Sequence, residues 1–260
     1  VSTRPTAVSL PNALRYILHK LKSRSTRFHS LAELREIVKE AAEEFVKISE
    51  RAVERIGEIG ERRIENGDVI LTHCNSQAVI SILTRAHEKG KEIRVIATET
   101  RPRFQGRMTA EQLDEKGIEV TLIVDSAVRY VMNEVNKVLV GADAIAANGA
   151  VVNKIGTSLI ALAAHEARKR FLVAAETYKF SSETLLGELV KIEERPQEEV
   201  VDVEWLRSRR KVMVRNPAFD VTPPLYVDAI ITELGVIPPQ AFFLIAKERF
   251  GSFLEEELPL

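Results

Sequence analysis

The sequence predicts an α/β fold in which a Rossmann-like, mostly parallel sheet carries helices on both faces and follows a helical N-terminal region. The first observation behind this prediction is the helical spacing of apolar residues over much of 11–65. The second is the regular alternation, after Gly67, of short β-branched runs with amphipathic segments. Continuous apolar strands joined by helical crossovers indicate a parallel sheet covered on both sides. We therefore expect a helical region at 1–66 and an α/β domain at 67–260.

The N-terminal region is expected to contain two helices. A short apolar-faced helix is predicted over 12–21, before "SRSTRFHS" interrupts the pattern. A long helix should begin after Ser30, because Ser30 and Glu33 have the spacing of a capping box. Asn66-Gly67 is predicted to close this helix.

The α/β region is expected to alternate strands and helices in regular order. The predicted strands are "DVILTHC", "EIRVIATET", "IEVTLIVD", "KVLVGADAI", "FLVAAETYKF" and "VDAIITELG". Helices are expected near 77–89, 109–116, 126–135 and 157–169. Asn148-Gly149 predicts a hairpin-type turn beside the fourth strand. The most polar stretch, 191–210, is expected to run over the surface.

Composition limits the classes of partner. The net charge of -1, with 45% hydrophobic and 29% charged residues, does not call for a nucleic acid or a membrane surface as partner. No apolar run approaches the roughly 20 residues that cross a bilayer, and the sequence does not open like a signal peptide. The single cysteine excludes an intrachain disulfide framework and fits a reducing, cytoplasmic compartment.

Polar residues follow each predicted strand, and in a parallel sheet the carboxyl ends of the strands border the ligand crevice. The residues expected at this edge are His73, Cys74, Asn75 and Ser76, then Glu99, Thr100, Arg101 and Arg103, then Asp125 and Ser126, then Asp143, Asn153 and Lys154, and finally Glu176, Thr177, Tyr178 and Lys179. One thiol, several carboxylates and several cations are thus predicted to share one edge.

Cys74 has two interpretations. Ser76 can cap the following helix, which places the thiol beside a helix N-terminus, where free N–H groups and the helix dipole favour anions. Both effects lower the pKa of a thiol and suit a base or nucleophile. The alternative is that Cys74 is buried filler, as most lone cysteines are.

Asp143 also has two interpretations. It ends an apolar strand beside small residues and could exchange a proton with a ligand. It could equally cap a turn.

The cations could bind phosphate, although each alone is more typical of a solvated surface. The candidates are Arg4, Arg101, Arg103, Lys154 and Lys179. His73 and Cys74 are neighbours on a strand and should point to opposite faces, which argues against a Cys–His pair. The sequence has no metal-ligand spacing, G-x-G-x-x-G motif or Walker motif.

Seven ordered motifs resemble one family. They are "TRPTAVSLPNALRY", "GDVILTHCNSQA", "TETRPRFQG", "VLVGADAI", "GAVVNKIGT", "AAETYKF" and "NPAFDVTPPLYVDAIITELGVIPP". Together they look like archaeal ribose-1,5-bisphosphate isomerases, in the superfamily of methylthioribose-1-phosphate isomerases and the regulatory subunits of translation initiation factor two B. The resemblance runs from Arg4 to about residue 250.

The resemblance implies conversion of α-D-ribose 1,5-bisphosphate to ribulose 1,5-bisphosphate in archaeal nucleoside monophosphate salvage. It implies that Cys74 accepts a proton and Asp143 donates one, with no metal or organic cofactor. The residues that it places against the substrate are Arg4, Ser76, Gln77, Ala78, Asn153, Lys154 and Lys179. It also suggests a homo-oligomer built on dimers.

Two related functions share this resemblance. A methylthioribose-1-phosphate isomerase would bind one phosphate and an apolar thioether, whereas the cation-rich edge here favours two phosphates. A regulatory initiation-factor subunit generally needs no Cys–Asp pair, and this sequence has both Cys74 and Asp143. The family also carries an N-terminal Arg-Gly-x-Gly phosphate motif whose place precedes Val1, so we expect the helical region to be truncated here.

Overall fold

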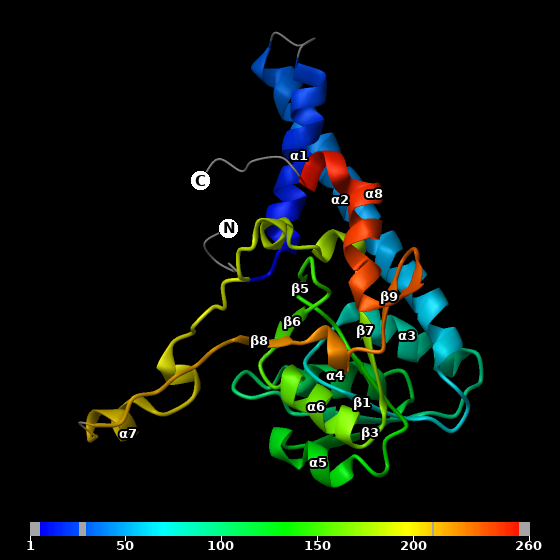
Figure 1. The fold of residues 1–260 in the computed structure, drawn as a ribbon, viewed down its shortest axis with the longest axis vertical. Helices are drawn as coiled ribbons and strands as arrows, with labels where there is room; N and C mark the ends of the chain where they lie inside the picture. Colours follow the sequence, from blue (N-terminus) through cyan, green and yellow to red (C-terminus); the bar gives the residue numbers. More distant parts are fainter. Residues whose placement is uncertain (1–5, 26–29, 210, 255–260) are drawn as a thin grey trace.

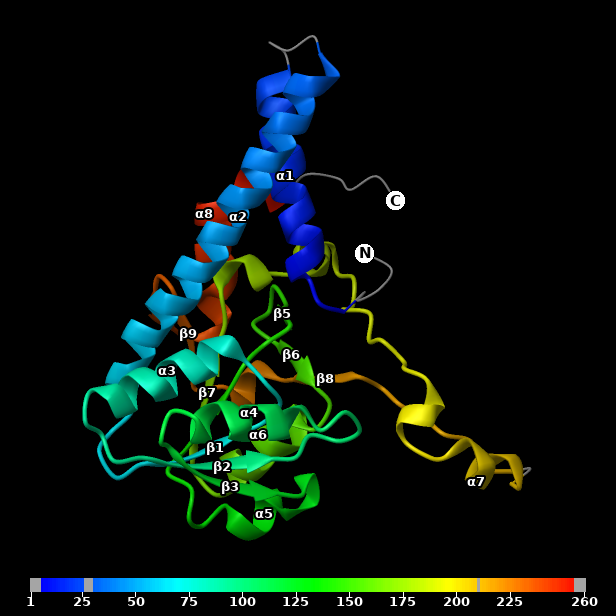
Figure 2. The same ribbon diagram turned by 180° about the vertical axis from the view of Figure 1, so that it is seen from behind.

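The computed structural model describes residues 6–25, 30–209 and 211–254, and in these ranges it shows a helix-covered sheet from which a pair of long helices projects (Figure 1). The pair consists of α1 (Ser9–Ser25) and α2 (Leu31–Gly60), which lie side by side in both views (Figures 1 and 2). The expected α/β architecture behind a helical N-terminal region is confirmed.

The long helix α2 begins as predicted. The Ser30 hydroxyl accepts a hydrogen bond from the Glu33 N–H at 3.3 Å, and the Glu33 carboxylate accepts one from the Ser30 N–H at 3.1 Å. The end predicted at Asn66-Gly67 was wrong, because it lies more than one turn beyond the observed end of the helix. The helix stops at Gly60, where a β-carbon would clash with Ile82 of the neighbouring helix, and a short 3₁₀ turn follows before Asn66.

The main sheet has seven strands in the order β10-β9-β7-β4-β1-β2-β3. Every neighbouring pair is parallel except β10, which runs antiparallel to β9. The strands are β1 (Val69–Thr72), β2 (Arg94–Thr98), β3 (Glu119–Ile123), β4 (Lys137–Val140), β7 (Arg170–Ala174), β9 (Ala229–Thr232) and β10 (Gly235–Ile237).

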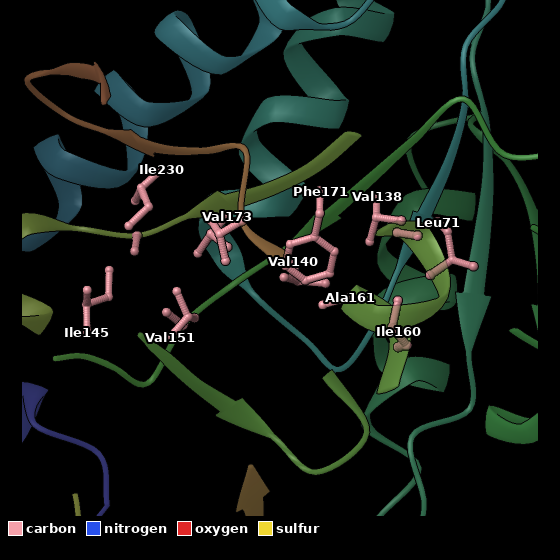
Figure 3. Packing of buried hydrophobic residues seen from close by; sticks show 14 of the residues in the cluster. Leu71, Val138, Val140, Ile145, Val151, Ile160, Ala161, Phe171, Val173 and Ile230 are labelled. Atoms are coloured by element: carbon pink, nitrogen blue, oxygen red, sulfur yellow. The ribbon is translucent and has the colours of Figure 1, made fainter. Parts of the chain in front are cut away.

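Helices cover both faces of this sheet. One face carries α3 (Gln77–Glu88) and α4 (Gln105–Asp114), and the other carries α5 (Val128–Val131) and α6 (Thr157–Glu166). Side chains alternate along each strand, so Leu71 and Val140 pack towards Ile160 of α6, whereas Ile70 and Leu139 join the core of α3. Figure 3 shows the first of these two cores. The two cores therefore fix the strands, and with them the strand ends, from both faces of the sheet.

The predicted strand over 137–145 is in fact two strands. After β4 the chain leaves the main sheet at Gly141 and enters β5 (Ala144–Ile145), which belongs to a second sheet of three strands. This small antiparallel sheet also contains β6 (Val151–Lys154) and β8 (Phe219–Thr222). The predicted hairpin at Asn148-Gly149 joins β5 to β6 and is confirmed.

An extended arm (187–209 and 211–216) leaves the body before β8 and carries the short helix α7 (Val203–Arg207) (Figures 1 and 2). The polar stretch 191–210, which was predicted to run over the surface, lies in this arm as far as Arg209; it is exposed or half-buried, as expected, but it projects from the body instead of lying along it. The described part of the chain ends in α8 (Phe242–Leu254), which the sequence pattern did not reveal and which packs beside α1. In the described part of the chain, none of the helices combines the length and the apolar character needed to span a bilayer.

Candidate active site

The order of the strands places a crevice between β1 and β4. From β1 the chain builds the sheet outward through β2 and β3, and from β4 it builds in the opposite direction through β7 and β9. Ligands of such sheets bind at the carboxyl ends of the strands beside this reversal. Cys74 follows β1 and Asp143 follows β4, so the two candidate acid–base residues stand on either side of the reversal.

A polar cavity of about 290 Å³ opens at this point. Its walls include every residue that the family resemblance assigns to the site and that the structure describes, namely Cys74, Ser76, Gln77, Ala78, Asp143, Asn153, Lys154 and Lys179. Arg4 lies outside the described residues. Five further lining residues were not among the predicted site or strand-end residues, although each falls within one of the quoted motifs: Ser9, Gln105, Gly141, Ala142 and Phe219.

Cys74 is buried and held in an unusual backbone conformation. Its φ of 68° lies in the left-handed region, which a residue with a side chain rarely adopts without support. That support comes from two threonines: the Cys74 N–H donates to the Thr100 hydroxyl at 2.9 Å, and the Thr109 hydroxyl donates to the Cys74 carbonyl at 2.7 Å. The backbone on which the thiol stands is therefore fixed from both sides.

The N-terminus of α3 forms the wall next to Cys74. Ser76 is its N-cap, and its hydroxyl accepts from the Val79 N–H at 3.5 Å, while Gln77 and Ala78 begin the first turn. The free N–H groups of a first turn favour a negatively charged ligand. The segment just before Asp143 approaches this cap closely, because Gly141 has no side chain that would clash with Ser76.

The β5–β6 hairpin supplies the opposite wall. The Asp143 N–H donates to the Val152 carbonyl at 2.8 Å, which ties the half-buried aspartate to β6. The Asn153 amide donates to the Thr157 hydroxyl at 3.1 Å, and that hydroxyl donates to the Lys154 carbonyl at 2.6 Å. Thr157 begins α6, so one helix start positions both a polar and a cationic residue of the cavity.

A loop after β7 (residues 176–180) completes the cavity with Glu176, Tyr178 and Lys179. The helical region holds this loop, because the buried Asn12 amide of α1 donates to the carbonyls of Tyr178 at 2.6 Å and Phe180 at 2.9 Å. The site is therefore built jointly by the α/β body and the N-terminal helices.

His73 takes no direct part in the cavity. Its Nδ1 lies 2.6 Å from the Thr98 hydroxyl and its Nε2 lies 2.9 Å from the Ile155 carbonyl. Burial lowers the pKa of His73 below its ordinary value of 6.5, so the ring is neutral at neutral pH. Because both ring nitrogens contact a threonine hydroxyl and a backbone carbonyl, His73 has a structural role beside the site.

Arg101 and Arg103 do not line the cavity, contrary to the prediction that they could join the phosphate-binding cations there. The loop that carries them turns towards the arm instead. Arg103 forms an ion pair with Glu199, and the Arg101 guanidinium donates to the Val200 carbonyl at 3.2 Å. Both arginines are exposed and are engaged in holding the arm.

Among residues 6–25, 30–209 and 211–254, no group of three or more His, Cys, Asp or Glu side chains could hold a metal ion. The chemistry open to the cavity is that of a thiol, a carboxyl group and cations in a partly enclosed polar space. Such a set can move protons on a ligand whose ends are anionic.

Comparison with known proteins agrees with this architecture. The sequence matches the Initiation factor 2 subunit family over residues 1–239. It is 57% identical over 251 residues to the ribose 1,5-bisphosphate isomerase of Pyrococcus furiosus, covering 96% of this chain and 78% of the relative. It is 56% identical over 262 residues to the enzyme of the same name from Archaeoglobus fulgidus, covering 100% and 81%.

A solved structure is similar as well. The Pyrococcus horikoshii OT3 translation initiation factor eIF-2B superposes with a TM-score of 0.76 at 39% identity, covering 90% of this chain and 77% of that one. The chain therefore belongs to the Initiation factor 2 subunit family.

Proposed function

We propose that the protein is an isomerase that converts α-D-ribose 1,5-bisphosphate to D-ribulose 1,5-bisphosphate. The observation that carries the proposal is the convergence of Cys74 and Asp143 on one polar cavity at the strand-order reversal. Two relatives more than 55% identical, which carry the name ribose 1,5-bisphosphate isomerase, support the choice of substrate. Archaeal nucleoside monophosphate salvage is the setting that the resemblance implies.

The reaction needs a base at C2 and an acid at a neighbouring oxygen. In the proposed mechanism the Cys74 thiolate takes the proton from C2 while the C1–ring oxygen bond breaks and Asp143 protonates that oxygen. A C1=C2 enol results. The enol hydroxyl then returns its proton to Asp143 and C1 receives the proton from Cys74, which yields the ketose with no net gain or loss of atoms.

The two phosphates would bind through different features of the cavity. The first turn of α3, with Ser76, Gln77 and Ala78, offers N–H groups to one anionic end. Lys154, Lys179 and Arg4 would provide positive charge, and Asn153 a polar contact. Enclosure of this space would protect the enol from water and from loss of phosphate. The mechanism uses no metal or organic cofactor, and its thiol needs a reducing compartment such as the cytoplasm.

One assay tests this function. The purified full-length protein is incubated with ribose 1,5-bisphosphate and, separately, with methylthioribose 1-phosphate, and each product is identified by mass spectrometry and NMR. We expect ribulose 1,5-bisphosphate from the first substrate and no comparable turnover of the second. Turnover of methylthioribose 1-phosphate alone would assign the chain to that isomerase, and turnover of neither would favour a regulatory subunit.

We also propose that the protein is a homo-oligomer built on dimers. The outward face of α6 supports this, because Leu159 is 72% exposed and the adjoining Leu225 is 74% exposed. A helix that is apolar on its outer side as well as its inner side is typical of burial. Analytical ultracentrifugation of the wild type and of Leu159→Glu tests it, and a wild-type monomer at micromolar concentration would contradict it.

A further inference from the structure

The wall of the cavity holds an ion pair between Lys179 and Glu176, and neither the sequence pattern nor the proposed reaction assigns Glu176 a task. Lys179 Nζ lies 2.8 Å from Glu176 Oε2, and the two side chains are only 16% and 7% exposed. Both residues line the same cavity as Cys74 and Asp143. A buried ammonium is stable only beside an opposite charge, so this carboxylate is the partner of Lys179 while no anionic ligand is bound.

The carboxylate of this pair is fixed. The Tyr178 hydroxyl donates to Glu176 Oε1 at 3.3 Å and also lies 2.7 Å from the Ser49 hydroxyl of α2. Burial, together with the charge of Glu176, raises the pKa of Tyr178, so the phenol keeps its proton. The backbone next to it is held as well, because the Thr177 N–H donates to Glu233 at 3.1 Å.

The ammonium of the pair is the movable member. Lysine carries its charge on a flexible four-carbon stem, whereas Glu176 is tied at Oε1. On the other oxygen, Oε2, no hydrogen bond from a described residue is found, so the nearby Lys179 charge is its main stabilising contact. A ligand that attracts Lys179 would therefore leave Oε2 open to accept a hydrogen bond, and ribose hydroxyls are suitable donors.

We propose that Glu176 is the counter-ion that Lys179 exchanges for a phosphate of the substrate. This inference rests on the proposed function, in which the cavity takes a sugar bisphosphate. A phosphate dianion attracts an ammonium more strongly than a single carboxylate does, so the exchange is favourable, but the phosphate must come close to the fixed negative charge of Glu176. Glu176 is thus a positioning residue that reserves Lys179 for strongly anionic ligands and weakens their binding.

Phosphate affinity tests the exchange directly. The dissociation constant of inorganic phosphate is measured by calorimetry on the full-length wild type and on Glu176→Gln. Removal of the competing charge is expected to tighten binding by ~5-fold or more, the scale of a like-charge contact that solvent partly screens. In the Lys179→Met background the same substitution should gain less than ~2-fold, because no ammonium is left to exchange.

A matched control separates this local effect from overall charge. Glu44 on α2 pairs with Lys20 at 3.0 Å on the exposed surface of the helical pair, outside the cavity. Glu44→Gln removes the same charge from another Lys–Glu pair and should leave phosphate affinity unchanged. Equal tightening in Glu44→Gln and Glu176→Gln would overturn the proposal, as would unchanged or weaker phosphate binding in a folded Glu176→Gln.

The test remains decisive if Glu176→Gln does not fold. Glu176→Asp keeps the charge but withdraws it from Lys179 by one methylene, so we expect phosphate to bind more tightly than in the wild type, by a smaller factor. Weaker binding in Glu176→Asp contradicts the exchange. Because the readout is phosphate binding and not turnover, a wild type without isomerase activity would sink the proposed function alone. Normal turnover with no change in phosphate affinity would sink the exchange alone.

Discussion

Gly141 and Ser76 touch across the strand-order reversal. A β-carbon on Gly141 would lie 2.6 Å from the Ser76 hydroxyl oxygen and 2.7 Å from the Ser76 β-carbon. Ser76 caps the helix that follows Cys74, and Gly141 leads from β4 to Asp143. This contact therefore sets how closely the segment of the candidate base approaches the segment of the candidate acid.

Substitution of Gly141 should damage both stability and catalysis. Gly141→Ala forces the Ser76 cap or the end of β4 to move, which is expected to cost about 1–3 kcal/mol in the free energy of unfolding. A displacement of the acid relative to the base should lower kcat by at least ~10-fold, since proton transfer depends strongly on geometry. Urea denaturation and steady-state kinetics measure the two effects.

Gly90→Ala is the control for Gly141→Ala. Gly90 has a φ of 80°, but a β-carbon there would meet nothing within 4 Å, and it lies beyond the C-terminus of α3, at the other end of that helix from Ser76. It should lose about 1 kcal/mol from backbone strain and keep its kcat. Similar losses of kcat in both variants would mean that the Gly141–Ser76 contact has no special role.

Thr100 is expected to act through the backbone of Cys74. Thr100→Val keeps the side-chain shape but removes the acceptor for the Cys74 N–H, which leaves a buried donor unpaired at a cost of about 1–3 kcal/mol. Because Cys74 holds a left-handed conformation, we expect the loss to appear in kcat more than in KM. The comparison variant is Asn136→Ala, which removes the acceptor of the Val69 N–H at the opposite end of β1. It should lose stability without losing kcat.

The N-terminal helices should be coupled to the site through Asn12. Asn12→Ala removes both hydrogen bonds to the 176–180 loop and leaves two buried carbonyls without this donor, at roughly 1–3 kcal/mol each. The loop carries Lys179, so KM for the bisphosphate should rise by ~10-fold or more. Hydrogen exchange of the 176–180 amides gives an independent readout, and unchanged protection together with unchanged KM would refute the coupling.

His73 should make stability depend on pH. As the pH falls through 6.5, the unfolded chain takes up a proton on this histidine, whereas burial keeps the native ring neutral to lower pH. Protonation therefore stabilises the unfolded state, and native stability is lost as the pH falls below 6.5, by up to about 1.4 kcal/mol per pH unit. Urea midpoints at pH 7.5, 6.5 and 5.5 should fall more steeply for the wild type than for His73→Gln. Parallel curves would contradict the assignment.

The sequence could predict which residues lie at the carboxyl ends of the strands, because that prediction depends only on residues adjacent in the chain. An apolar strand followed by short polar residues places Cys74 and Asp143 at the same edge of any parallel sheet, and the structure brings them to one cavity. It could not predict the break at Gly141, because "KVLVGADAI" reads as one apolar run and only the contact with Ser76 shows where the chain turns away.

Other features of the site depend on contacts between distant segments. Gln105 and Phe219 reach the cavity from α4 and the small sheet, and no periodic pattern marks them. Arg101 and Arg103 follow a strand like the true cavity residues, but their loop turns to the arm, whose position could not be inferred from a polar composition. The location of these two arginines therefore becomes known only from the three-dimensional structure.

The central claim is that the Cys74 thiolate takes a proton from the sugar, and the rate of ribulose 1,5-bisphosphate formation by Cys74→Ser tests it most directly. With saturating ribose 1,5-bisphosphate in a single-turnover experiment, Cys74→Ser should be slower than the wild type by at least ~100-fold, since a serine hydroxyl is a far weaker base. Substrate affinity should change little. A folded Cys74→Ser that forms ribulose 1,5-bisphosphate within a few-fold of the wild-type rate would remove the thiol from the mechanism.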